Sequence, residues 1–210
     1  IMVNRLNQII CVIFLYFSSN TIQASSEDMT IKNLITGERE NFHLRVLESI
    51  PKNGLISIGP ENAKNVIIEF FDYKCGFCVK MHPELIQLVE ERNDTKVVFI
   101  QYPILSQTSV KLARLVLAAN YQGKGFEIHH SLLTEPGPLN EERINKIINE
   151  SKIDSDLIVK DLDRKEIEET LSITAFIAAG IGARGTPAVF INDKFNPGYV
   201  PKNKIEELLN

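Results

Sequence analysis

The feature that most limits the fold of this chain is an apolar run, Val66–Phe71, with a pair of cysteines shortly after it. A nearly continuous apolar run of this length predicts a strand buried on both faces, as in parallel sheets. A helical pattern begins near the cysteines, and a second apolar run, Lys96–Tyr102, ends at Pro103. Strand, helix and strand in this order predict a β-α-β unit and therefore a parallel sheet.

Helical periodicity fills the middle of the chain, between the second strand and an apolar segment near the C-terminus. It predicts helices over residues 110–119, 126–133, 141–148, 154–162 and 167–179. Strand signals resume at Ala188–Ile191 and at a short edge strand near Lys194–Phe195, and Pro201 opens a final helix. The chain therefore reads as an α/β protein with a helical insertion at about residues 104–180, between the second and third core strands.

The N-terminus has the layout of a secretory signal peptide, since Arg5 precedes the apolar stretch Ile9–Phe17 and small residues lead to Ala24. We expect cleavage after Ala24, which makes residues 1–24 a signal for export to the periplasm. An uncleaved anchor is the alternative, although a span needs about 20 apolar residues. Cleavage also removes Cys11, one of three cysteines. The net charge of -4 gives no nucleic-acid footprint.

A helical apolar stripe precedes the first strong strand: Phe42, Val46, Leu47 and Ile50 recur with helical spacing. We therefore expect an N-terminal helical segment over residues 25–59, ahead of a main domain over residues 60–210. The stripe has two possible partners, its own domain or a second copy of the chain. The second option predicts a homo-oligomer.

The two remaining cysteines, Cys75 and Cys78, enclose Gly76-Phe77. Such a short loop restricts the unfolded chain little, so redox chemistry explains the pair better than stability does. At a helix start, main-chain N–H groups favour a thiolate at Cys75, which attacks a disulfide, and Cys78 resolves the mixed disulfide.

Metal and haem sites explain the pair less well. Cys75, Cys78 and His82 would supply three ligands, whereas a structural zinc site needs four. A c-type haem site requires histidine directly after the second cysteine, and Val79 occupies that place. We expect no metal and no other cofactor. His129 and His130 lie on the predicted inserted helices and are expected to be structural or exposed.

A family resemblance rests on two motifs in the right order. Cys75–Pro83 looks like the redox helix of the thioredoxin superfamily, including the proline eight residues after the first cysteine. Glu69-Phe70-Phe71, Arg184–Phe190 and the helical insertion resemble the DsbA-like branch. The likeness covers Val66–Leu209. It implies a thioredoxin fold and an enzyme, a protein thiol–disulfide oxidoreductase.

The resemblance also implies roles for three further residues. Thr186-Pro187 would form a cis-proline turn that faces the cysteines and pairs with a bound peptide; a proline before an apolar strand fits this place. Glu69 is the polar exception in its strand, and burial should raise its pKa and let it exchange a proton with Cys78. The alternative is a carboxylate that reaches solvent or a lysine.

Gly76-Phe77 bears on the direction of the reaction, because strongly oxidising DsbA-like members typically have Pro-His there. Phenylalanine offers a thiolate no donor or charge, so we expect a weaker oxidant. The first hypothesis is an enzyme that forms disulfides in cysteine-containing exported proteins and is reset by a membrane redox partner. The alternatives are a reduced, oligomeric isomerase or reductase, and a non-catalytic peptide-binding module.

Overall fold

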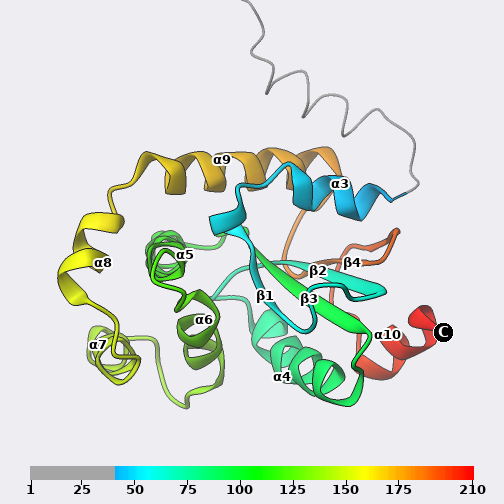
Figure 1. The fold of residues 1–210 in the computed structure, drawn as a ribbon, viewed down its shortest axis with the longest axis horizontal. Coiled ribbons are helices and arrows are strands. Elements are labelled where there is room, and N and C mark those ends of the chain that lie inside the picture. The colour runs from blue at the N-terminus through cyan, green and yellow to red at the C-terminus, as the bar shows by residue number, and fades with distance from the viewer. Residues whose placement is uncertain (1–40) are drawn as a thin grey trace, which may run out of the picture. The chain divides into compact units, whose positions relative to one another are not determined.

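The computed structural model describes residues 41–210, whose strands form one five-stranded sheet (Figure 1). The spatial order is β1-β3-β2-β4-β5. Strands β2 and β3 are parallel, and the other neighbouring pairs are antiparallel. The strand bounds are β1 Ile56–Ile58, β2 Asn65–Phe71, β3 Thr95–Gln101, β4 Ala188–Ile191 and β5 Lys194–Asn196. The predicted signal peptide and Cys11 lie outside the described residues.

The predicted β-α-β unit is confirmed as β2, helix α4 (Gly76–Glu91) and β3. Every residue of β2 is buried, because helices cover both faces of the sheet. Helices α4 and α10 (Lys202–Leu209) lie on one face, and α3 (Phe42–Glu48) and α9 (Lys165–Gly180) lie on the other (Figure 1). Side chains alternate along a strand, so Glu69 shares the α4 face of β2 with Phe71.

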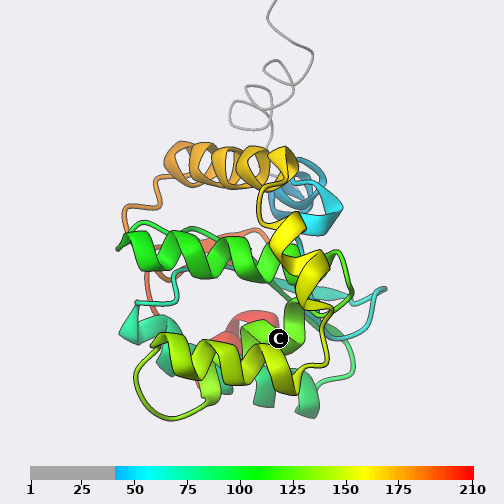
Figure 2. The ribbon, with the colours of Figure 1, turned by 90° about the vertical axis from the view of Figure 1, so that its left-hand side faces the viewer.

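The helical insertion between β3 and β4 is present as expected, which makes this a thioredoxin fold with an added helical block. Its helices are α5 Gln107–Asn120, α6 Gly125–Thr134, α7 Glu141–Glu150, α8 Ser155–Asp161 and α9. Figure 2 shows α9, α5 and α7 at successive levels beside the sheet. Side chains of Ser106, Asn140 and Asp154 cap the starts of α5, α7 and α8. No helix within residues 41–210 has the length and apolarity needed to cross a membrane.

The apolar stripe before the sheet forms α3, and it packs on its own domain. Val46 is fully buried, and the ring of Phe42 lies 5.8 Å from that of Phe190 on β4. His43 Nδ1 lies 2.8 Å from Asp193 Oδ1, in the turn between β4 and β5. The helical segment expected over residues 25–59 omitted strand β1, which pairs antiparallel with β3. Part of that segment therefore belongs to the sheet.

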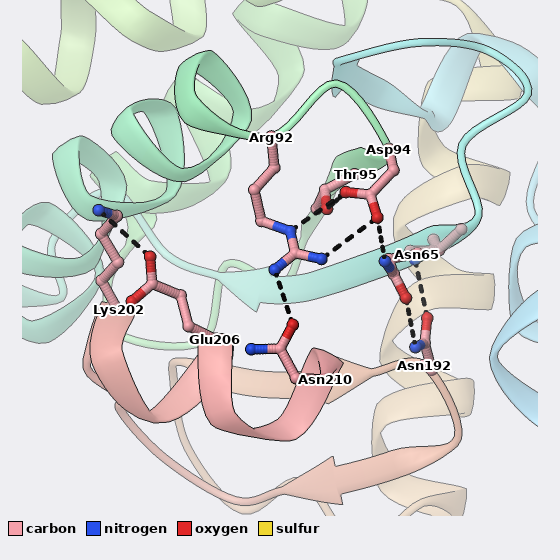
Figure 3. Close-up of polar contacts among 9 residues, drawn as sticks. Asn65, Arg92, Asp94, Thr95, Asn192, Lys202, Glu206 and Asn210 are labelled. Atoms are coloured by element: carbon pink, nitrogen blue, oxygen red, sulfur yellow. Dashed lines mark hydrogen bonds and ion pairs between the residues drawn. The ribbon is translucent and has the colours of Figure 1, made fainter.

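A polar network holds together the end of the sheet where β2 begins (Figure 3). Asn65 Nδ2 donates to Asp94 Oδ2 at 3.0 Å, and Asn192 Nδ2 donates to Asn65 Oδ1 at 3.1 Å. Arg92, at the end of α4, binds both Asp94 and Asn210. These bonds join α4, α10 and the β4–β5 turn. They hold β2 in place at its first residue, and the cysteines follow the other end of this strand.

Candidate redox site

Cys75 caps the N-terminus of α4 with its own sulfur. The Cys78 N–H donates to Cys75 Sγ at 3.4 Å, so the sulfur occupies the place of a capping side chain. The Cys75 thiol also donates to the carbonyl oxygen of Thr186 at 3.1 Å. An anion at this position would receive the N–H groups and the positive end of the helix dipole. Cys75 is 6% exposed, which leaves a small part of its surface open to a partner.

The Thr186-Pro187 peptide bond is cis, as the resemblance implied, and it directly precedes β4. Because β4 pairs with β2, the sheet brings Thr186 against Cys75 from 111 residues away. The hydroxyl of Tyr102, just after β3, donates to the Ala183 carbonyl at 3.3 Å. Thr186 Oγ1 is buried and has no hydrogen-bond partner among residues 41–210. The loop before β4 is therefore joined to the end of β3 by the Tyr102 bond and to the start of α4 by the Cys75 bond.

Glu69 and Cys78 form the buried half of the site, and both are 1% exposed. Burial raises the pKa of Glu69 to about 8, and hydrogen bonding with the Cys78 thiol offsets part of that rise. Burial and the nearby Glu69 carboxylate raise the pKa of Cys78 well above its ordinary value. Its burial excludes the alternative in which Glu69 reaches solvent, and its hydrogen-bond partner is the Cys78 thiol and not a lysine. At neutral pH the pair therefore holds its protons.

Asp72, in the loop between β2 and α4, is a functional candidate that the sequence analysis missed. It is 1% exposed, and its carboxylate accepts from the main-chain N–H groups of Lys74 and Leu105 and from the Ser109 hydroxyl. Its carbonyl oxygen accepts the Cys75 N–H at 3.0 Å. A carboxylate three residues before a C-x-x-C pair is the signal that could have drawn attention to it.

The dipeptide between the cysteines faces outward. A Cβ on Gly76 would meet no atom within 4 Å, and Phe77 is 60% exposed. The Phe77 ring stacks on Tyr199 with centroids 6.0 Å apart, and Lys80 Nζ lies 4.3 Å from the centroid of Tyr199. The dipeptide is thus supported from the segment before α10, while Gly76 leaves the first helical turn open.

Three histidines gather where α4 packs on α6, His82 on the first helix and His129 and His130 on the second. His82, one turn after Cys78, and His129 are fully buried, and His82 Nε2 lies 2.9 Å from His130 Nδ1. Gln101 Nε2 donates to the Tyr73 hydroxyl, which lies 3.1 Å from His129 Nδ1. Burial and the neighbouring His130 lower the pKa of His82 to about 3, and burial lowers that of His129. The imidazoles of His82 and His129 are therefore neutral at physiological pH.

A cavity of about 450 Å³ opens beside the start of α4. Lys74, Gly76 and Val79 line one side, and residues 132–139 of the α6–α7 connection line the other. Within residues 41–210, no group of three or more His, Cys, Asp or Glu side chains is arranged to hold a metal ion. His82, considered as a zinc ligand in the sequence, is paired with His130.

The fold and the site together define a class. A thioredoxin sheet carries two thiols at the start of a helix, opposite a cis-proline turn and above a buried carboxylic acid. That arrangement is typical of enzymes that exchange thiols and disulfides.

Comparison with known proteins gives the family. A model of the DSBA-like thioredoxin domain matches residues 66–210, so the chain belongs to the DsbA-like thioredoxin family and is a thiol–disulfide oxidoreductase. A probable disulfide bond formation protein D of Bacillus anthracis is 27% identical over 157 residues, which cover 68% of this chain and 72% of the relative.

Solved structures agree with this family. A thioredoxin-like oxidoreductase from Silicibacter pomeroyi DSS-3 matches with a TM-score of 0.71 and 28% identity, over 76% of this chain and 91% of that chain. The thiol-disulfide exchange protein alpha-DsbA2 from Wolbachia pipientis matches with a TM-score of 0.67 and 25% identity, over 89% of this chain and 96% of that chain.

Proposed function

We propose that the protein introduces disulfide bonds into exported proteins through Cys75 and Cys78. The observation that carries this proposal is the placement of Cys75 at the start of α4, with Sγ 3.1 Å from the Thr186 carbonyl and Cys78 one turn on. The name of the Bacillus anthracis relative, a probable disulfide bond formation protein, supports the direction. The predicted signal peptide supports action in the periplasm.

The proposed reaction starts from the Cys75–Cys78 disulfide. A substrate thiolate attacks the Cys75 sulfur, the bond to Cys78 breaks, and Cys78 leaves with the electron pair as a thiolate. Glu69, with a pKa of about 8, holds a proton at neutral pH that it gives to Cys78. A second substrate thiolate then attacks the substrate sulfur of the mixed disulfide, which forms the substrate disulfide and releases Cys75 as a thiolate.

The substrate peptide lies along Thr186 and Pro187 in this proposal, because Thr186 main-chain groups face Cys75. The cavity beside Gly76 offers room for side chains that flank the substrate cysteine. The resulting dithiol is returned to the disulfide by a membrane redox partner, whose own disulfide or equivalent acceptor takes two electrons. No metal or other cofactor enters these steps.

The Gly76-Phe77 pair favours a second candidate, a disulfide isomerase or reductase that works in the reduced state. Phe77 gives the thiolate no donor or positive charge, so the dithiol gives up its electrons more readily, as the reduction of a wrong disulfide requires. An oligomer would suit an isomerase. Val46 of the apolar stripe is already buried within the domain, so a dimer would need another surface.

Thiol trapping in cells, combined with a redox equilibrium against glutathione and a native mass, decides between the two candidates. An oxidase is expected to hold Cys75 and Cys78 mostly as a disulfide, and a strongly oxidising monomer would overturn the isomerase candidate. A mostly reduced pair in a reducing dimer or trimer would overturn the oxidase proposal. A Cys75→Ala variant with full biological activity would overturn both and leave a peptide-binding module.

A further inference from the structure

The carboxylate of Asp72 is buried beside the cysteines and is satisfied by neutral donors. Its Oδ1 accepts from Lys74 N–H at 2.7 Å and from the Ser109 hydroxyl at 2.6 Å, and its Oδ2 accepts from Leu105 N–H at 2.9 Å. A buried carboxylate is costly unless hydrogen bonds compensate it. Three well-placed donors from two separate segments therefore fix this side chain in one position.

These bonds also fix the backbone that leads into Cys75. The bond from Lys74 N–H to the side chain two residues earlier is the contact of an Asx turn. The bond from Cys75 N–H to the Asp72 carbonyl, at 3.0 Å, closes the same turn through the main chain. The turn sets the direction in which Cys75 enters α4, and hence the approach of its sulfur to the Thr186 carbonyl.

Asp72 also reaches the second cysteine. Its main-chain N–H hydrogen bonds to the Cys78 sulfur, which lowers the pKa of that thiol against the rise caused by burial and by Glu69. One residue thus contacts Cys75 through its carbonyl and Cys78 through its N–H. Its side chain is anchored to Leu105, after β3, and to Ser109 on α5.

We propose that Asp72 is a positioning residue of the redox centre: its anchored carboxylate holds the main-chain N–H against Cys78 and the turn that places Cys75. This inference rests on the proposed exchange at Cys75 and Cys78. In the resolving step the Cys78 thiolate attacks the Cys75 sulfur of a mixed disulfide. The Cys75–Cys78 bond forms, the bond from Cys75 to the partner sulfur breaks, and the partner leaves as a thiolate with the electron pair.

The test follows glutathione disulfide as it reacts with the reduced full chain, because two glutathione thiols are released in turn. The first is released when Cys75 attacks, and the second when Cys78 resolves the mixed disulfide. The reaction is run at a series of pH values between 6 and 9 and is stopped with acid at successive times, which separates the two rates. The variants are Asp72→Ala and Asp72→Asn. The matched control is Asp161→Asn, which alters another buried aspartate, 4% exposed and bound to Arg164 on the insertion.

Asp72→Ala is expected to slow the second release about tenfold at pH 7 and to move its pH profile up by about one unit, because a less stabilised thiolate is scarcer. Asp72→Asn keeps an oxygen as acceptor for Lys74 N–H and the Ser109 hydroxyl but turns an NH2 donor toward Leu105 N–H, so a slowing of about threefold is expected. Asp161→Asn is expected to keep both the rate and the profile.

The inference is overturned if the second release and its pH profile in the Asp72 variants match the control. If Asp72→Ala does not fold, the nearly isosteric Asp72→Asn decides between the two outcomes. Failure of the proposed function looks different: the wild-type protein would then release no glutathione, or a Cys75→Ser variant would release it at the wild-type rate. Wild-type release of both thiols, with unaffected Asp72 variants, defeats the Asp72 inference alone.

Discussion

Replacing Glu69 with glutamine should make the protein more stable at neutral pH. The carboxyl has a pKa of about 8 in the folded protein and 4.5 ordinarily, so it is protonated when folded and ionised when unfolded at pH 7. Unfolding therefore releases a proton, and stability is lost as the pH rises from 4.5 to 8. Ionisation of Glu69 in the unfolded chain thus lowers the free energy of unfolding by about 5 kcal/mol above pH 8 and by about 3 kcal/mol at pH 7.

Glutamine cannot ionise, so Glu69→Gln removes this loss. Its amide has to find partners, and Glu69 Oε1 already has none within the described part of the chain, so about 1–2 kcal/mol is given back. Urea unfolding of the reduced proteins should show a variant that is more stable by roughly 1–2 kcal/mol at pH 7. The gain should grow toward pH 8 and vanish near pH 5. A difference that stays constant from pH 5 to 8 would refute the reasoning.

Three other predictions concern the surroundings of the site. Since the pKa of His82 is about 3, wild-type stability should fall as the pH drops from 6.5 toward 3. In His82→Leu, the free energy of unfolding from thermal scans should fall less steeply over this range, by about 1.4 kcal/mol per pH unit; an unchanged slope would contradict this. Phe77→His should shift the glutathione equilibrium about tenfold toward the reduced protein, because histidine can donate to a thiolate; no shift would remove Phe77 from redox tuning. Asp193→Ala loses the bonds to His43 and Asn41 N–H, so the free energy of unfolding should fall by about 1 kcal/mol and the urea midpoint should fall with it; an unchanged midpoint would mean that apolar contacts alone hold α3.

The core of the fold could be predicted because its elements carry strong local patterns. Strand β2 is a continuous apolar run, and α4 starts at the cysteines, so the β-α-β unit follows from adjacent residues. Strand β1 could not be predicted, because Ile56–Ile58 is too short to show a period and owes its strand geometry to pairing with β3. The partner of α3 could not be predicted either, because the contact between Phe42 and Phe190 joins residues that lie far apart in the sequence.

The site divides in the same way. The cysteines and the turn at Thr186-Pro187 belong to recognisable motifs, and their contact at 3.1 Å follows from the sheet that pairs β4 with β2. Asp72 could not be predicted as part of the site, because its role depends on Leu105 and Ser109, which lie 33 and 37 residues away. A spacing rule within one segment carries no information about such contacts.

The histidines show a further limit of local patterns. His129 was expected to be structural or exposed, and the structure buries it fully, whereas its neighbour His130 is partly exposed. The pairing of His82 with His130 joins α4 to α6 across 48 residues. Adjacent residues on one helix point in different directions, so burial on α6 depends on the position of α4.

The central claim is that Cys75 attacks and Cys78 resolves, and trapping of the mixed disulfide tests it most directly. Cys78→Ser and Cys75→Ser variants are mixed with a cysteine-containing peptide disulfide, and the adduct is measured by intact mass over time. Cys78→Ser should accumulate one adduct on Cys75 that persists, and Cys75→Ser should form none on that timescale, with turnover lost in both. An adduct that forms equally fast on Cys78 in the Cys75→Ser variant, or turnover that survives either substitution, would contradict the account.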